Sequence, residues 1–181
     1  MTALNFSPLP RPAAPCPKEI RNMRRSEREI TDKTFMLNVL QDAETLYIAQ
    51  NTGEAPYVFC VNPFMHEGEL YFHCAPEGRK IDLMARDPRA GFFAAADIRV
   101  EKTTTRYRSV SGTAVMEKVQ DAALKAEALK SLAKKYKAPC KFPVSDEKFA
   151  ATMIIHLRIE SMTCKYSRPG EGPRPVPHYV D

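Results

Sequence analysis

A chain of 181 residues is long enough for one domain with a substantial hydrophobic core. Its 44% hydrophobic and 27% charged residues are typical of a soluble globular protein and argue against overall disorder. The net charge of +5 is moderate, and the basic residues are scattered without interleaved aromatics, so the sequence does not predict nucleic-acid binding. No run approaches the ~20 apolar residues of a membrane span, and the N-terminus lacks the apolar segment of a secretory signal. We therefore expect a cytoplasmic protein without a membrane or nucleic-acid partner.

The cysteines indicate neither a disulfide framework nor a metal centre. Their number is odd, and no two of them form a Cys-x-x-Cys pair. In a reducing compartment they are most simply small buried hydrophobic side chains. The five are Cys16, Cys60, Cys74, Cys140 and Cys164. We expect no metal ligands among them.

Proline-rich segments flank the central part of the chain. Prolines at positions 8, 10, 12, 15 and 17 oppose both helix and sheet, so residues 1–22 are expected to form an N-terminal arm. That arm is either a free tail or a segment that lies on a partner subunit. Residues 169–181 are again rich in proline and are expected to form a C-terminal tail. The folded domain then covers residues 23–168.

The folded part is expected to begin with a helix and a strand. Thr31 can cap a helix over residues 32–43, in which Phe35 faces inward. Residues 46–50 alternate as a strand, and a turn containing Gly53 leads to the next strand.

Two alternating strands form the centre of the sequence. Side chains of a strand point alternately to opposite faces. In the first strand, Tyr57, Phe59 and Val61 share one face, and Val58 and Cys60 share the other. In the second strand, Leu70, Phe72 and Cys74 oppose Tyr71, His73 and Ala75. A polar turn containing Gly68 lies between them, so we expect these two strands to pair as a β-hairpin.

After Ala75 the pattern changes from strand to helix. Gly78 marks a turn, and from Lys80 the apolar spacing is helical until Pro88, which cannot continue a helix. A helix start exposes unpaired N–H groups and partial positive charge, which favour an anion, and Arg79 and Lys80 add full charges. The alternative is a solvated first turn without a ligand.

The remaining elements complete the prediction of a barrel. Residues 91–96 are apolar throughout, which predicts a strand buried on both faces, and residues 98–105 read as a more polar connection. Further predicted elements are a strand over 107–116, helices over 121–136 and 145–151, and a strand over 153–166 whose His156 and Arg158 point away from the core. Because no βαβ alternation is present, we expect a mainly β fold with peripheral helices, a β-barrel of the α+β class.

Five short motifs follow one another along the chain. They are Met23-Arg24-Arg25 through Ile30-Thr31-Asp32, Pro56-Tyr57-Val58, Leu70-Tyr71-Phe72-His73, Gly78-x-Lys80, and Tyr107-x-Ser109-Val110-x-Gly112-x-Ala114. In this order they resemble the 5-nitroimidazole-resistance (Nim) proteins, which are FMN-binding split β-barrels related to pyridoxamine 5'-phosphate oxidase. The resemblance spans about residues 23–166.

The resemblance implies a homodimer with FMN bound at the subunit interface. The phosphate would lie against Gly78, Arg79 and Lys80, and the ring beside Tyr57, Val58 and Cys60. His73, Cys74 and Ala75 would lie along the same strand edge, and Tyr107 and Ser109 would supply further flavin contacts. Cys74 is either an inert buried residue or a thiol activated near a helix start.

The resemblance also implies an FMN-dependent oxidoreductase that reduces a small, electron-poor aromatic substrate such as a nitroimidazole. His73 stands at the position of a histidine associated with the Nim active site, and a neutral imidazole can donate a hydrogen bond or exchange a proton. The chain has no tryptophan and no evident C-terminal arginine–histidine cluster like the one with which true pyridoxamine phosphate oxidases hold their substrate, so that activity is not expected. Two alternatives remain: a barrel that binds haem or another tetrapyrrole near His73 or His156, and a non-catalytic flavin-binding module.

Overall fold

The computed structural model describes residues 23–102 and 104–167, so the predicted arm (1–22) and tail (169–181) lie outside the described residues. The helices are η1 (Ser26–Arg28), α1 (Lys33–Asp42), α2 (Arg79–Arg86), α3 (Ala122–Lys135) and α4 (Asp146–Ala151). The strands are β1 (Glu29–Ile30), β2 (Leu46–Gln50), β3 (Tyr57–Val61), β4 (Pro63–His66), β5 (Glu69–Cys74), β6 (Arg89–Glu101), β7 (Thr104–Lys118) and β8 (Met153–Tyr166). None of the described helices is long and apolar enough to cross a membrane.

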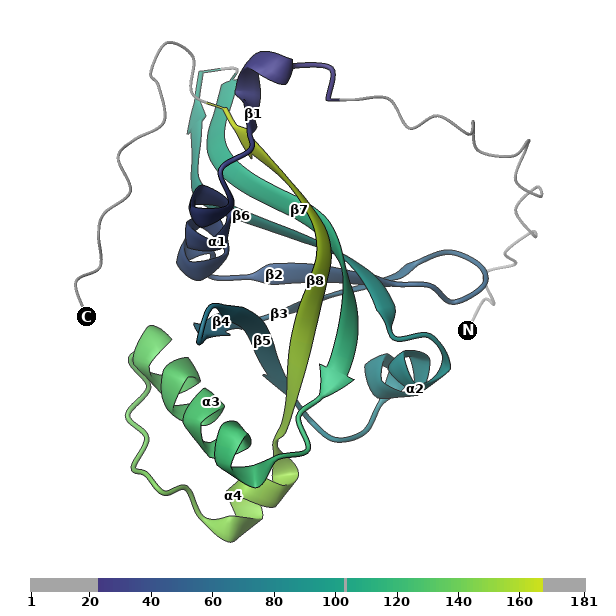
Figure 1. Ribbon diagram of the computed structural model, residues 1–181, viewed down its shortest axis with the longest axis vertical. Coiled ribbons are helices and arrows are strands. Elements are labelled where there is room, and N and C mark those ends of the chain that lie inside the picture. The colour runs from purple at the N-terminus through teal and green to yellow at the C-terminus, as the bar shows by residue number, and fades with distance from the viewer. Residues whose placement is uncertain (1–22, 103, 168–181) are drawn as a thin grey trace, which may run out of the picture.

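The strands form one antiparallel sheet in the order β3-β2-β6-β7-β8-β5-β4, with β1 added to β8. The two ends of this order, β3 and β4, are separated in the chain by Asn62 alone. The sheet therefore returns on itself through the backbone, and helices lie around it (Figure 1). The predicted mainly β fold with peripheral helices, the split β-barrel, is confirmed.

The predicted hairpin has the right turn but the wrong first strand. Glu67 and Gly68 both have positive φ, 49° and 80°, which is the geometry of a two-residue hairpin turn. Such a tight turn pairs β5 with the residues just before it, so β5 pairs with β4 and not with β3. β3 pairs instead with β2.

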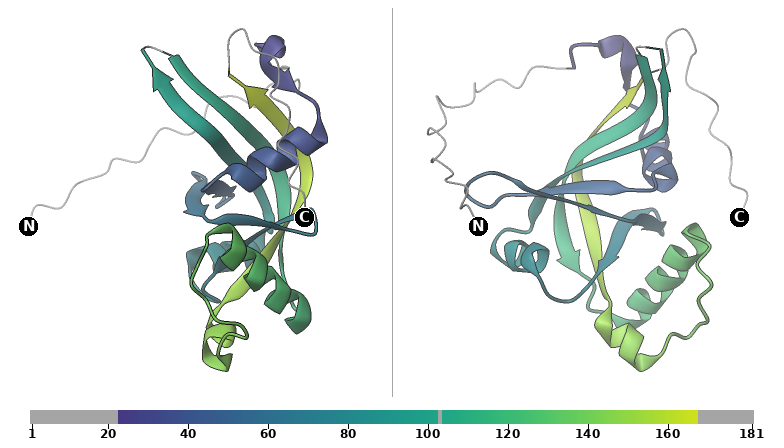
Figure 2. Two further views of the ribbon diagram at one scale, coloured as in Figure 1. Left: turned by 90° about the vertical axis from the view of Figure 1, so that its left-hand side faces the viewer. Right: turned by 180° about the vertical axis from the view of Figure 1, so that it is seen from behind.

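The connection predicted over residues 98–105 is instead part of a long β-ribbon. β6 and β7 pair as far as Glu101 and Thr104, and the tip of the ribbon projects away from the body (Figure 2). A bulge interrupts the pairing next to Asp97, whose φ is 55°. Arg108 holds this bulge because its guanidinium donates to Asp97 at 2.7 Å and to Asp42 of α1 at 2.9 Å. The polar residues of this stretch therefore mark ion pairs on a ribbon and not a loop.

The helices form close to their predicted bounds. α1 is capped by Asp32, whose carboxylate accepts from the Phe35 N–H at 2.6 Å, so the prediction of Thr31 as the cap is wrong by one residue. α2 and α3 begin within one residue of their predicted starts. The main core contains buried side chains from α1 and from strands on every side of the barrel, among them Val39, Leu40, Leu46, Ile48, Leu70, Phe72, Val110, Ile155 and Leu157.

Only one face of the strand around residues 91–96 is buried. Ala90, Phe92 and Ala94 point into the core, whereas Phe93 is exposed on the other face. The expectation of burial on both faces is therefore wrong for the single chain. Cross-strand pairing places Phe93 beside Tyr47, which is also exposed.

Candidate functional site

The turn before α2 presents an uncapped helix start. Gly78 occupies the N-cap position with φ 110°, a conformation that favours glycine, and no side chain caps the first turn. The backbone N–H groups of Ile81 and Asp82 donate to the Gly78 carbonyl, whereas the N–H groups at the very start have no such intrahelical acceptor. The structure thus places Gly78, Arg79 and Lys80 together at an uncapped helix start, and the binding of an anion there stays a prediction.

The two cations of this helix start lie over aromatic rings of β3. The Arg79 guanidinium is 4.6 Å from the centre of the Tyr57 ring, and the Lys80 Nζ is 5.3 Å from the centre of the Phe59 ring. The two rings stack on each other with centres 5.4 Å apart. Cation–π attraction at a partly exposed site is worth about 0.5–1 kcal/mol per contact. The fold therefore brings Tyr57 into one cluster with Arg79 and Lys80, which lie more than twenty residues further along the chain.

Gln50, at the end of β2, joins this cluster and was missed by the sequence analysis. Its side chain is 1% exposed, and its Nε2 donates to the Lys80 carbonyl at 3.0 Å. Gln50 points to the same face of β2 as the buried Leu46 and Ile48. The sequence signal that could have identified it is a polar side chain in the alternating pattern of a buried strand face.

His73 and Cys74 lie at the end of β5 and are electrostatically coupled to Lys80. Desolvation lowers the pKa of His73, and the positive charge of Lys80 lowers it further, so the imidazole is neutral at neutral pH. The Cys74 side chain is buried, and desolvation raises the pKa of its thiol against a smaller opposing effect of Lys80. This favours the inert buried thiol over the activated one. Ala75 is exposed just beyond the strand.

Other predicted site residues lie on a different surface, which we call the outer face. Cross-strand pairs place Cys60, Tyr47, Phe93, Ser111 and Thr163 on this one side of the sheet. Val58 shares the side of Cys60 and is 59% exposed. The apolar part of this face lies on β3, β2 and β6, and its hydroxyl-bearing part lies on β7 and β8.

Tyr107 and Ser109 line a hollow of about 400 Å³ on the outer face. The hollow is lined by Met23, Phe93, Ala95, Ile98, Thr105, Tyr107, Ser109, Ser111, Thr163 and Lys165. None of the residues at the start of α2 belongs to it. Within one chain, the predicted flavin contacts therefore fall into two groups, one at the start of α2 and one on the outer face.

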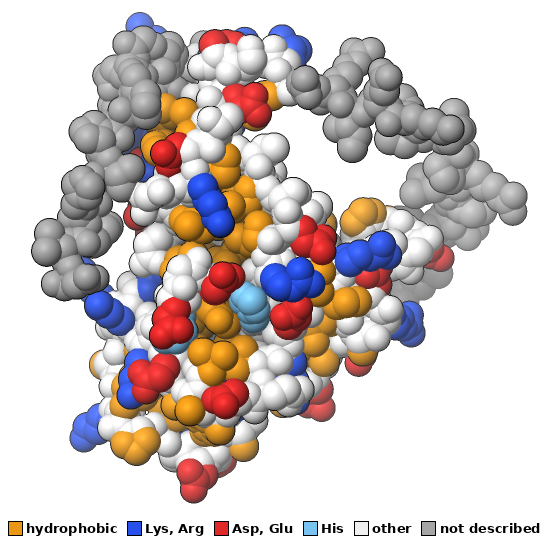
Figure 3. All heavy atoms as spheres, in the orientation of Figure 1, with side chains coloured by type: hydrophobic (Ala, Val, Ile, Leu, Met, Phe, Trp, Pro, Cys, Tyr) orange, Lys and Arg blue, Asp and Glu red, His pale blue; other side chains and the backbone are white. Residues whose placement is uncertain are grey.

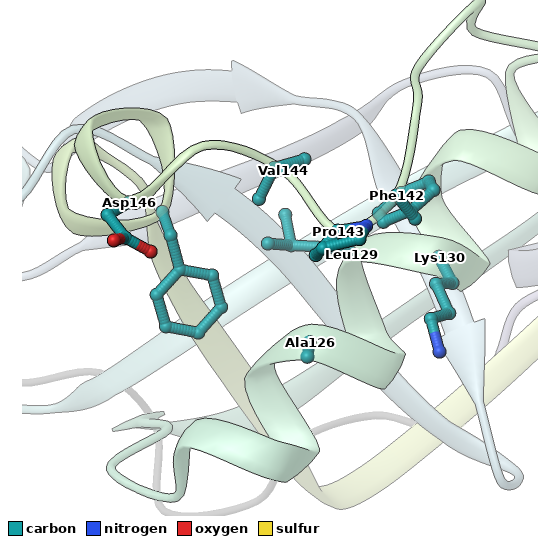
Figure 4. Close-up of a pocket in the computed structure, with 8 residues that line it drawn as sticks. Ala126, Leu129, Lys130, Phe142, Pro143, Val144 and Asp146 are labelled. Atoms are coloured by element: carbon teal, nitrogen blue, oxygen red, sulfur yellow. The ribbon is translucent and has the colours of Figure 1, made fainter.

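A second cavity, of about 450 Å³, lies between α3, α4 and the segment that joins them (Figure 4). Its wall is mainly apolar, with Leu129, Pro143 and Val144 drawn toward its centre and Lys130 and Asp146 at its edges. It contains no residue of the predicted site. Its size is in the range of small-molecule pockets, but its lining offers few converging polar groups.

The haem alternative loses one of its two candidate histidines. Both ring nitrogens of His156 face carboxylates, Glu69 at 3.1 Å and Glu117 at 3.6 Å, which disfavours His156 as a haem ligand and leaves His73 as the candidate. The described residues contain no cluster of three or more His, Cys, Asp or Glu side chains that could hold a metal ion. Acidic and basic side chains alternate over the surface in Figure 3, so that surface has no single-sign patch for nucleic acid.

Solved structures of known proteins share this fold. A candidate 5-nitroimidazole antibiotic resistance protein from Bacteroides thetaiotaomicron superposes with a TM-score of 0.66 and 22% identity over 76% of this chain and 85% of its own. The flavocytochrome Anf3 from Azotobacter vinelandii superposes with a TM-score of 0.68 and 20% identity, over 84% of this chain and 73% of its own. An FAD- and haem-binding protein from Mycobacterium smegmatis superposes with a TM-score of 0.68 and 17% identity, over 81% of this chain and 76% of its own. At these identities the likeness shows the fold alone.

Sequence comparison identifies the family more directly. No curated protein matches this chain in sequence. The family described as pyridoxamine 5'-phosphate oxidase, however, matches residues 32–166, which run from the cap of α1 to the end of β8. The match includes all the elements that form the barrel apart from the short β1. This chain therefore belongs to the pyridoxamine 5'-phosphate oxidase family.

Proposed function

We propose that this protein binds FMN and acts as an FMN-dependent oxidoreductase of the Nim type. The observation that carries the proposal is the cluster at the start of α2, where an uncapped helix turn, Arg79 and Lys80 meet the aromatic rings of β3. Backbone N–H groups and two cations suit a phosphate monoester. Flat aromatic and apolar side chains nearby suit a planar ring. The flavin-binding relatives named above add support for this ligand class.

We further propose that the binding site is completed in a homodimer. The outer face leaves Val58, Tyr47 and Phe93 exposed beside the hydroxyl-lined hollow that contains Tyr107 and Ser109. Pairing two outer faces would cover these apolar side chains and bring β7 of one protomer towards α2 of its partner. Such an arrangement would reunite the two groups of predicted flavin contacts.

In this proposal the flavin supplies the electron transfer, and the protein supplies position and a proton. His73 is the proposed proton relay: its exposed imidazole is neutral at neutral pH, so it first takes a proton from solvent and then passes that proton to the reduced substrate. Desolvation and the nearby Lys80 charge disfavour the imidazolium form, so the proton is readily given up. The proposed substrate is small, flat and electron-poor, as a nitroimidazole is.

An absorption spectrum of freshly purified protein, followed by titration with FMN and FAD, tests the cofactor. We expect the two visible bands of an oxidised flavin and tighter binding of FMN than of FAD. A Soret band would indicate a haem protein instead. Protein that carries no flavin and gains none on titration would refute the proposal, and bound flavin that no electron donor can reduce productively would indicate a non-catalytic module.

Replacing His73 with Phe is expected to leave FMN bound and to slow substrate reduction by about 10²–10⁴-fold, the usual contribution of a positioned general acid. Steady-state kinetics with a nitroaromatic acceptor would measure the loss. The matched control is His66→Phe, because His66 lies on β4 and contacts Ser131 at 3.0 Å.

The protonation state of His73 is measurable by NMR titration of the imidazole ring. We expect a midpoint below the ordinary value of 6.5, and an upward shift towards it in Lys80→Gln, because that variant removes the neighbouring positive charge. A lowered pKa makes the folded state bind fewer protons than the unfolded state, so the His73 contribution to stability is present above pH 6.5 and is lost as the pH falls below it.

In the kinetic test of His73→Phe described above, full turnover would exclude the proton-donor role.

A further inference from the structure

The start of α2 is anchored to the barrel in an unusual way. Leu83 is buried, and Ile81 and Met84 pack on the core, so apolar contacts fix the middle of this eight-residue helix. Its first turn has no side-chain cap of its own. The cations at the start rest on aromatic rings, which are contacts of flexible side chains and do not hold the backbone in place.

One side chain from the sheet does hold that backbone. Gln50 Nε2 donates to the Lys80 carbonyl at 3.0 Å. Gln50 is the last residue of β2 and pairs with Tyr57 of β3 on one side and Ala90 of β6 on the other. It therefore belongs to the interior of the sheet, where its backbone position is fixed. Lys80 is linked through Gln50 to the strand pair that also presents Tyr57.

The carbonyl oxygen of the same amide, Oε1, is buried and has no hydrogen-bond partner among the described residues. A buried acceptor without a partner lowers stability, and an apolar residue of similar shape would avoid that cost. Leu46 and Ile48 show that this face of β2 accepts apolar side chains. Gln50 is thus less favourable for stability than an apolar residue, but only its amide can bind the Lys80 carbonyl.

We propose that Gln50 is a positioning residue that fixes the first turn of α2 for the ligand. The inference rests on the proposed function, because the ligand is the phosphate assigned there to Arg79 and Lys80. Gln50 does not touch the phosphate. It sets the height and angle of the helix start relative to the rings of β3, so that backbone N–H groups and both cations converge on one anion.

The test compares Gln50→Met, which keeps the length of the side chain without its amide, with the unaltered protein. Hydrogen exchange is measured first, without flavin. The N–H groups of Ile81 and Asp82 donate to the Gly78 carbonyl at 2.8 and 3.1 Å, so they report on the first turn. We expect their exchange to accelerate about 3- to 10-fold, as for the loss of one neutral hydrogen bond. The Asp87 N–H, which donates to Leu83 at the other end of α2, is expected to be unchanged.

Flavin affinity and thermal unfolding complete the test. In Gln50→Met we expect the Kd for FMN to rise by a similar factor, while the unfolding temperature is not lowered. A residue with a merely structural role would give the reverse pattern, a lower unfolding temperature with unchanged affinity. Gln50→Leu repeats the measurement in case the first variant folds poorly. Gln41→Met, a half-buried glutamine changed on α1, is the control.

The outcomes separate the two proposals. Unchanged exchange at Ile81 and Asp82, or an unchanged Kd for FMN in both variants, would overturn the role of Gln50 and leave flavin binding intact. If the unaltered protein binds no FMN, the proposed function fails, and the exchange rates still decide whether Gln50 holds the helix start.

Discussion

Replacing Lys80 with Glu is expected to raise the Kd for FMN at least tenfold while leaving the barrel folded. Lys80 Nζ lies over the Phe59 ring at the start of α2, where an anion would be held. A charge-assisted hydrogen bond to phosphate contributes about 1.5–3 kcal/mol, which corresponds to roughly 10- to 150-fold in affinity, and the new carboxylate adds repulsion. Stability should change little, because an acidic residue in the first turn is favoured by the helix dipole.

Riboflavin separates the phosphate contact from other effects of this change. Riboflavin carries the same ring as FMN without the phosphate, so its Kd should be almost equal in the variant and the unaltered protein. Lys33→Glu is the matched control, since Lys33 is the exposed first residue of α1 and undergoes the same charge reversal at another helix start. Fluorescence titration measures all these constants. Equal FMN affinity in Lys80→Glu and the unaltered protein would reject Lys80 as the phosphate residue.

The largest effect on stability is expected from Gly112→Ala in β7. A Cβ at this position would clash with the Ser161 carbonyl of β8 and would lie 2.5 Å from the Cζ of the buried Phe92. The carbonyl belongs to the strand ladder, next to a register shift at Thr113, and cannot move without disturbing both strands. Overpacking of this kind costs about 3 kcal/mol at the upper end of its usual range. For a chain of this size that lowers the unfolding temperature by about 6–12 °C.

Gly91→Ala provides the comparison for this variant. Gly91 lies on the adjacent strand β6, and an added Cβ there would meet only the Gly112 carbonyl at 4.0 Å, an ordinary contact. Its unfolding free energy should therefore stay close to that of the unaltered protein. Denaturant unfolding followed by circular dichroism measures both variants. Equal stability of the two alanine variants would show that the β7–β8 ladder adjusts more easily than the structure indicates.

The sequence predicted elements better than it predicted their partners. Alternation in Tyr57–Val61 assigned both faces of β3 correctly, because side-chain parity is a local property of the backbone. The partner of β3 is not local, since it depends on where the chain turns. Two positive φ angles at Glu67 and Gly68 select β4 as the partner of β5, and this leaves β3 for β2. The sequence alone places a turn near Gly68 but does not fix which two residues form it, so it does not fix the partner of β5.

The candidate site was predicted in part for a similar reason. Gly78, Arg79 and Lys80 are consecutive, so their position at a helix start follows from local pattern. Gln50 contributes through a contact across thirty residues, which no local pattern reveals. The apolar run around Phe93 indicates that both faces of β6 meet apolar partners, but the sequence does not say whether the second partner belongs to the same chain.

The backbone passage from β3 to β4 through Asn62 has a mechanical consequence. These two strands end the hydrogen-bonded order of the sheet, so the barrel wall is joined there by a covalent link and not by a ladder of inter-strand bonds. Closure of the barrel at this point therefore depends on the length of the chain between Val61 and Pro63. Asn62 also ties this junction to the segment before β2, because its side-chain amide donates to the Glu44 carbonyl at 3.3 Å.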